Sequence, residues 1–203
     1  MSTQLRLYSV SLATLDVFVR PANVSLVEGG RSRAAAIDAE GYVRGSRTVT
    51  EALEDIVADR PKAPDAGGAY GLAWEIVVDQ LESKRFEFGP MRLGAQFLDE
   101  ASGELRGRGV PDELTPVSFM YRSPFTGTPY PADVPAIGHL SAAQVAELHT
   151  AYQANLESFR NSDYASLVRT ILAAAEEVVD FNRFADGMDD EDIPHCDLVT
   201  FYS

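Results

Sequence analysis

QLRLYSV at residues 4–10 and LVTFY at residues 198–202 are the two stretches that decide the fold. In the first stretch Leu5 and Leu7 alternate with polar side chains and Ser9 continues their side, which is the period-two pattern of a strand. The second stretch is rich in the β-branched and aromatic residues that favour strands. We expect the two strands to lie side by side, so that one sheet ties down both ends of the chain.

Apolar residues between these strands recur at helical spacing in several places. Residues 12–20 predict a short helix that stops before Pro21, because the residue preceding a proline is pushed out of the α region. An Ala-rich helix over residues 34–39 is expected to end near Gly41. A further apolar stripe predicts a helix over residues 72–81.

Two capping boxes mark helix starts more sharply. In a capping box, the hydroxyl of the first residue and the side chain three residues later each accept a hydrogen bond from the other's free backbone N–H. Thr48 with Glu51 predicts a helix that runs to about Arg60, and Ser141 with Gln144 predicts another. Each prediction depends on only two residues that are three positions apart.

The helix after Ser141 and the next one are expected to pair as a hairpin. Asp163 is predicted to cap the second helix, whose wide apolar stripe extends from Leu167 to Val179. The apolar face of the first consists of Val145, Leu148, Tyr152 and Phe159.

The sequence as a whole predicts one α+β domain over residues 1–203. Its small antiparallel sheet includes the N- and C-terminal strands and is covered on one side by several amphipathic helices. Within residues 85–122, only Val117–Tyr121 has the pattern of a strand. Prolines recur through residues 123–137, which predicts an extended surface segment.

The net charge of −14 is concentrated toward the C-terminus. Residues 123–203 hold 13 acidic and 3 basic side chains, which accounts for −10 of that charge. A field of this sign repels nucleic-acid phosphates and anionic lipid surfaces and attracts basic partners. We therefore expect a basic protein partner and neither a nucleic-acid nor a membrane partner; the alternative is an acidic surface that only keeps the protein in solution.

Carboxylates at the end of the last predicted helix form the candidate partner-binding site. Glu176 and Asp180 are four residues apart, so like charges face each other, and a helix C-terminus prefers cations. A basic partner would relieve that conflict. The acidic run that follows lacks the ligand order of a calcium loop, so no metal site is predicted there. The predicted partner-binding residues are Glu176, Glu177, Asp180, Asp186, Asp189, Asp190, Glu191 and Asp192.

The common signatures of catalysis are absent from the sequence. No G-x-S-x-G elbow, H-E-x-x-H helix or C-x-x-C pair occurs, so we predict no catalytic residue and no cofactor. His195 and Cys196 are adjacent on a predicted strand and point to opposite faces, which argues against a thiolate and its base. The single cysteine excludes an intramolecular disulfide and is typical of a reducing cytoplasm.

A competing hypothesis is an enzyme or a small-ligand-binding protein. Its pocket would lie near the arginines of residues 31–47 and the aromatic residues Tyr121, Phe125 and Tyr130. Glycines next to arginines occur at residues 29–33, but not in the order of a phosphate-binding loop. The two hypotheses stay open on the sequence alone.

Ala132–Leu140, running into the capped helix, and the ending Asp197–Ser203 resemble a family of uncharacterised actinobacterial proteins of about this length. The resemblance lies mainly in the final third of the chain. It implies one compact domain and a bacterial cytoplasmic setting, and it supplies no catalytic residue.

Overall fold

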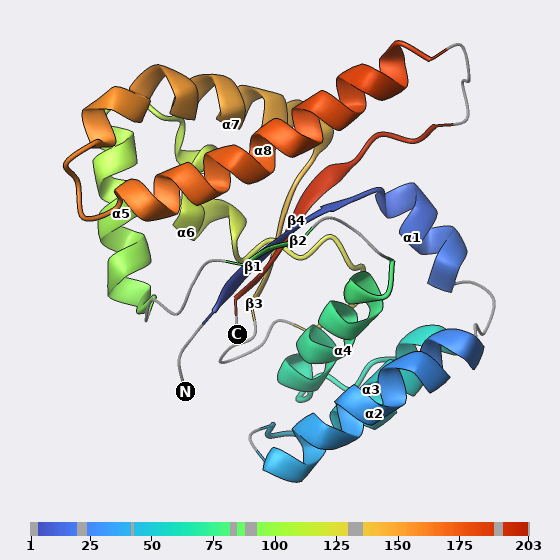
Figure 1. Cartoon of the computed structure of the whole chain (residues 1–203). Helices are drawn as coiled ribbons and strands as arrows, with labels where there is room; N and C mark the ends of the chain where they lie inside the picture. The colour runs from blue at the N-terminus through green and yellow to red at the C-terminus, as the bar shows by residue number, and fades with distance from the viewer. Residues whose placement is uncertain are drawn as a thin grey trace.

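A four-stranded antiparallel sheet runs through the middle of the described part of the molecule (Figure 1). The computed structural model describes residues 4–19, 24–41, 43–81, 85–87, 93–129, 136–188 and 193–202. Within these residues the strands are β1 (Leu5–Val10), β2 (Arg85–Glu87), β3 (Ala136–Leu140) and β4 (Asp197–Tyr202), in the spatial order β2-β1-β4-β3. β1 and β4 pair from Leu5 opposite Tyr202 to Val10 opposite Asp197. The predicted antiparallel sheet with both terminal strands is therefore confirmed.

Helices account for most of the remaining described residues. They are α1 (Leu12–Val19), α2 (Val24–Glu40), α3 (Val49–Val57), α4 (Gly67–Asp79), α5 (Ala95–Gly107), α6 (Pro116–Phe119), α7 (Ala142–Asn155) and α8 (Ala165–Asp186). Short 3-10 turns, η1 (Asp112–Leu114) and η2 (Leu156–Phe159), adjoin α6 and α7. Among the described residues, no helix combines the length and the apolar character needed to cross a membrane.

The helices cover both faces of the sheet, so the expectation of one covered side is wrong (Figure 1). Leu5 and Leu7 of β1 point into a core shared with α5–α8, while Tyr8 and Val10 point into a second core shared with α1–α4. Successive side chains of a strand alternate between faces, so one strand serves both cores. The run LVTFY at residues 198–202 is apolar on both sides, as is typical of a strand buried on both faces.

The two predicted capping boxes are both formed. Glu51 N donates to Thr48 Oγ1 at 3.1 Å, and Thr48 N donates to Glu51 Oε2 at 2.9 Å. Ser141 and Gln144 make the equivalent pair at the start of α7. α7 and α8 then lie side by side as the predicted hairpin, with the apolar stripe of α8 buried (Figure 1).

Two local predictions are wrong. Val117–Tyr121 is not a strand, because Pro116 begins the short helix α6 and Val117 N donates to Ser102 Oγ at 3.0 Å. Asp163 does not cap α8, which begins after Tyr164 without a side-chain hydrogen bond at its N-terminus. The bond from Val117 to Ser102 joins α6 to α5, a contact between distant segments that local preference does not reveal.

The proline-rich segment is only partly described. Residues 123–129 contain neither helix nor strand, and Ala136 and Ile137 already belong to β3, while residues 130–135 lie outside the described residues. The extended surface segment over residues 123–137 therefore stays a prediction. Gly138 follows in β3, where a Cβ atom would collide with the backbone of Met120 and the side chain of Thr200. The glycine is therefore required by the close approach of β3 to the end of α6.

A buried carboxylate on α4 links this helix to the sheet and to α2. Glu75 is 1% exposed, and its Oε1 accepts hydrogen bonds from Arg6 of β1 and from Arg33 of α2, the latter at 3.0 Å. Arg33 also pairs with Asp79, one turn further along α4. Removing one member of a buried ion pair leaves the other charge uncompensated in a dry environment, which is strongly destabilising. The cluster therefore holds β1, α2 and α4 in one arrangement.

We predict that Glu75→Gln lowers the free energy of unfolding by about 3 kcal/mol, because Arg6 and Arg33 lose the charge of this buried carboxylate. Urea unfolding followed by circular dichroism measures the change. Glu54→Gln is the matched control, since Glu54 pairs with Arg31 at an exposed site and its loss costs less than about 1 kcal/mol. Equal losses in the two variants would contradict the role given to Glu75.

Candidate functional site

The predicted partner-binding carboxylates that the structure describes lie in the second half of α8. Glu176, Asp180 and Asp186 are exposed, and Glu177 is half-buried. The other four predicted residues, at 189–192, lie outside the described residues. The structure thus gathers four of the predicted carboxylates on one helix end.

Two of these carboxylates have side-chain partners at exposed sites. Asp180 Oδ1 lies 3.0 Å from Arg183 Nη1, and Asp186 Oδ1 lies 2.8 Å from His195 Nε2. Pairs at exposed sites contribute only about 0–1 kcal/mol, because water screens them. Their carboxylates are therefore accessible to the cations of another protein.

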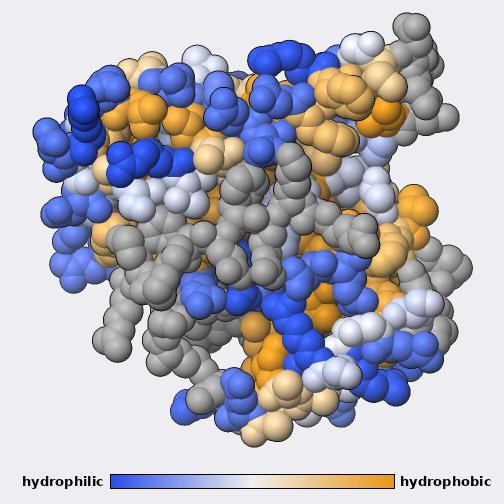
Figure 2. All heavy atoms as spheres, in the orientation of Figure 1, coloured by the Kyte–Doolittle hydropathy of each residue, from blue (hydrophilic) through white to orange (hydrophobic). Residues whose placement is uncertain are grey.

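Large apolar side chains also reach solvent at this end of α8, which the sequence analysis did not anticipate. Phe181, Phe184 and Met188 are 39%, 59% and 46% exposed. Phe181 and Phe184 are three residues apart in α8 and so lie on one flank of the helix, and Met188 follows two residues after Asp186, the last residue of the helix. Figure 2 shows orange residues over the C-terminal end of α8, next to blue ones. We name these three residues, with Glu176, Glu177, Asp180 and Asp186, the α8 surface.

The sequence does contain a signal for this exposed flank. The buried stripe of α8 continues past Val178 through Asn182 and Ala185, which are themselves buried. Phe181 and Phe184 fall outside that continuation of the helical period. Following the stripe to the end of the helix would therefore have marked both phenylalanines as exposed.

The end of α8 is fixed to the same end of the sheet from which α1 emerges. The Asn182 side chain donates to Cys196 O at 2.9 Å and accepts from Cys196 N at 2.7 Å, just before β4 begins. Asp197, the first residue of β4, is paired with Val10, the last residue of β1. α1 follows β1 directly and exposes Val17 to 75%. The strongly exposed large apolar residues of the described chain therefore lie at one end of the sheet.

The adjacent pair His195 and Cys196 does not form a catalytic dyad. Burial raises the pKa of the Cys196 thiol, so the thiolate is disfavoured, and His195 bonds to Asp186. Within the described ranges, no three His, Cys, Asp or Glu side chains are grouped as metal ligands.

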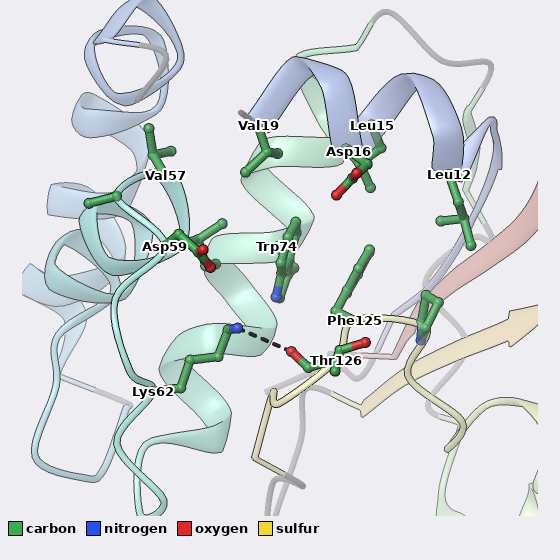
Figure 3. Close-up of a pocket in the computed structure, with 13 residues that line it drawn as sticks. Leu12, Leu15, Asp16, Val19, Val57, Asp59, Lys62, Trp74, Phe125 and Thr126 are labelled. Atoms are coloured by element: carbon green, nitrogen blue, oxygen red, sulfur yellow. Dashed lines mark hydrogen bonds between the residues drawn. The ribbon is translucent and has the colours of Figure 1, made fainter. Parts of the chain in front are cut away.

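A cleft of about 800 Å³ lies between α1, the end of α3, α4 and residues 124–126 (Figure 3). The rings of Trp74 and Phe125 are stacked within it, with centroids 3.9 Å apart and planes 14° apart. Trp74 Nε1 donates to Thr128 Oγ1 at 3.0 Å, which holds the indole in place. The apolar wall is completed by Leu12, Leu15, Val19, Ile56 and Val57. The volume of the cleft lies within the range of small-ligand pockets.

Three charged side chains line the cleft: Asp16 from α1, and Asp59 and Lys62 from the segment after α3 (Figure 3). Lys62 Nζ donates to Thr126 O at 3.1 Å across the cleft. The Asp59 carboxylate has no hydrogen-bond or ion-pair partner among the residues that the structure describes.

Asp59 has the unusual backbone conformation φ 49°, and no other described non-glycine residue has a positive φ. Its N–H donates to Ile56 O at 3.2 Å and the N–H of Arg60 donates to Asp55 O at 2.9 Å, so the two bonds form a Schellman motif at the end of α3. Glycine is the usual residue at this position, because it adopts positive φ without steric cost. The aspartate therefore brings a carboxylate to the cleft at a cost in backbone energy.

The arginines of residues 31–47 are mostly engaged in ion pairs. Arg31 pairs with Glu54, Arg33 pairs with Glu75 and Asp79, and Arg47 pairs with Asp55. A hollow of about 220 Å³ lies beside this segment, lined by residues between 38 and 51.

The aromatic residues named with these arginines do not share one site with them. Phe125 lies in the cleft, Tyr121 packs against the opposite core, and Tyr130 lies outside the described residues. The structure therefore does not assemble the arginines and the described aromatics into a single pocket.

Fold and site together define an α+β protein whose central sheet is buried on both faces and whose last helix ends in an exposed acidic and apolar surface. The chain belongs to the family described as "Domain of unknown function (DUF7691)", whose model matches residues 1–203. The expectation of an uncharacterised family is confirmed, and the match covers the whole chain, whereas the resemblance lay mainly in the final third. Searches of curated proteins and of solved structures found no match.

Asp55 shows how the charged segment before α3 supports the fold. Its carboxylate is 4% exposed and accepts hydrogen bonds from Arg47 Nε at 3.0 Å and from Tyr70 OH at 2.9 Å. Burial alone would raise the pKa of Asp55, but these hydrogen bonds and the charge of Arg47 outweigh it and hold the pKa below its usual value. Arg60 lies on the other carboxylate oxygen at 3.5 Å.

The pKa of Asp55 is lower in the folded state than in the unfolded state, so the ionised carboxylate stabilises the fold. This contribution is fully present above the unfolded pKa of about 4, and it is lost as the pH falls through the folded pKa. We predict that Asp55→Asn lowers the free energy of unfolding by about 2 kcal/mol at pH 7. The difference from the unsubstituted protein should shrink below about pH 4.

Urea unfolding at several pH values between about 3 and 7 measures this difference across the range in which carboxylates titrate. Asp112→Asn, at an exposed pair with Arg106, serves as the control and should change stability little at any pH. If Asp55→Asn lowers the free energy of unfolding as much at pH 3 as at pH 7, the ionised Asp55 carboxylate is not the source of the stability.

Proposed function

We propose that this protein is an interaction module that binds a basic protein partner through the α8 surface. The proposal rests on one observation: Phe181 and Phe184 are exposed on one flank of a helix end that also carries exposed carboxylates, and Met188 is exposed just beyond that end. Contiguous exposed apolar residues rimmed by polar ones mark interaction sites on soluble proteins. The same helix end is held at a defined place by the hydrogen bonds of Asn182, so the surface is prearranged.

The chemistry of the α8 surface specifies the partner. Phenylalanine and methionine are enriched at the centres of protein interfaces, and Met adapts to irregular partner surfaces. Carboxylates at the rim pair with lysine or arginine and speed association. The partner is therefore a protein that presents an apolar patch ringed by basic residues. Asp189, Asp190, Glu191 and Asp192 follow α8 in the sequence and belong to the proposed set. An inhibitor, an immunity protein or a regulator would act in this way.

A second candidate function is small-ligand binding, either by a binding protein or by an enzyme. The observation that favours it is the cleft beside Trp74. None of the described residues that line the cleft belongs to the α8 surface, so one protein could have both functions.

We also propose that residues 1–203 form one domain and that the protein comes from the cytoplasm of an actinobacterium. The pairing of both chain ends in one sheet supports the single domain. The resemblance to actinobacterial proteins supports the source, and a single cysteine, buried at Cys196, is compatible with a reducing compartment.

The α8 surface can be tested with a synthetic amphipathic helical peptide that has leucines on one face and lysines on the other. We predict that this peptide binds with an affinity that falls as salt is raised, and that a peptide with glutamate in place of lysine does not bind. Phe184→Ser and the double variant Asp180→Asn/Asp186→Asn should each weaken binding by about fivefold or more. Isothermal titration calorimetry gives the affinities.

The matched control is Asp99→Asn/Glu113→Gln, which removes two exposed carboxylates from α5 and η1. It should retain the affinity of the unsubstituted protein. Phe184 is largely exposed, so its substitution leaves the fold intact. Unchanged binding of Phe184→Ser, or equal losses in the two double variants, would rule out the α8 surface.

A further inference from the structure

We propose that the cleft between α1 and α4 binds a small organic cation with an apolar body, such as an aryl- or alkylammonium compound. The cleft lies on the face of the sheet that α1–α4 cover, and none of its lining residues belongs to the α8 surface. Its volume of about 800 Å³ is sufficient for a small organic molecule. This binding rests on the second candidate function, small-ligand binding, and specifies the class of ligand.

The aromatic pair provides a preorganised surface for the apolar body of the ligand. Trp74 and Phe125 are only 9% and 8% exposed, and both line the cleft. The stacking of the two rings and the hydrogen bond from Trp74 Nε1 to Thr128 fix their orientation before a ligand arrives. A cation next to an aromatic ring is attracted by the negative face of the π-system. Aromatic and aliphatic walls therefore suit an ammonium group that is attached to a hydrocarbon body.

The charges of the cleft favour a cation over an anion. Asp16 and Asp59 enter it from two different elements and lie on either side of Trp74 in Figure 3. Among the described residues that line the cleft, the basic side chain is Lys62, which donates to Thr126 O. The described lining thus holds two carboxylates and one ammonium, and the chain as a whole carries −14. The electrostatic field therefore concentrates cations in the cleft.

Asp59 places an exposed carboxylate at the edge of the cleft. It occupies a positive-φ position at which glycine would be less strained, and its carboxylate has no partner among the described residues. Aspartate is among the few non-glycine residues that adopt this conformation, and such positions often occur at binding sites. A ligand ammonium group supplies the partner that this carboxylate lacks in the structure.

Trp74, the single tryptophan of the chain, is a built-in reporter for this site. Three probes share a phenylethyl-type body and differ in charge: 2-phenylethylammonium, 2-phenylethanol and phenylacetate. We predict saturable changes in Trp74 fluorescence, with 2-phenylethylammonium binding at least about fivefold more tightly than either other probe. Asp59→Gly should weaken the binding of 2-phenylethylammonium by about fivefold while raising Tm by about 2 °C, because glycine relieves the backbone.

The control variant Asp99→Asn removes one exposed carboxylate from α5, outside the cleft, and should leave the affinity unchanged. The rise in Tm of Asp59→Gly shows that any loss of binding does not come from unfolding. Tighter binding of phenylacetate, unchanged affinity in Asp59→Gly, or absence of saturation with all three probes would each overturn the proposal. None of these outcomes bears on the α8 surface, whose residues the experiment leaves intact.

Discussion

The pairing of β1 with β4 is the constraint on which the rest of the structure depends. These strands come from the two ends of the sequence, and they form the centre of the sheet. Because successive side chains alternate, the same two strands supply Leu5 and Leu198 to one core and Tyr8 and Phe201 to the other. A shift of register by one residue would exchange these sets between the cores, so the pairing is strongly specified.

This pairing also determines where the candidate sites lie. At the end where Val10 meets Asp197, the Asp197 carboxylate binds His139 at 2.9 Å and the backbone N–H of Ala142 at 2.8 Å, which joins β3 and the start of α7 to β4. Asn182 attaches the end of α8 to the residue just before Asp197. α1 leaves β1 at the same end and then forms one wall of the cleft. One strand pair therefore positions both the α8 surface and the cleft.

The sequence predicted best what depends on neighbouring residues. The capping boxes at Thr48 and Ser141 were found because each involves two side chains three residues apart. The acidic end of α8 was found because charge is visible in the sequence. The second covered face was missed because its contacts join segments that are distant in the sequence; Arg6 of β1, for example, is compensated by Glu75 of α4. The cleft was missed for the same reason, since residues as distant as Leu12 and Thr126 line it.

The most direct test of this account is native-state hydrogen exchange of the backbone amides in β1 and β4. If the paired terminal strands hold both cores together, their hydrogen-bonded amides open only with global unfolding, and their exchange free energies equal the free energy of unfolding from denaturant titration. Terminal strands that did not hold the cores together would open locally, and their amides would exchange without global unfolding. Exchange of the central β1 and β4 amides at much lower free energies than those of α4 and α8 would contradict the account.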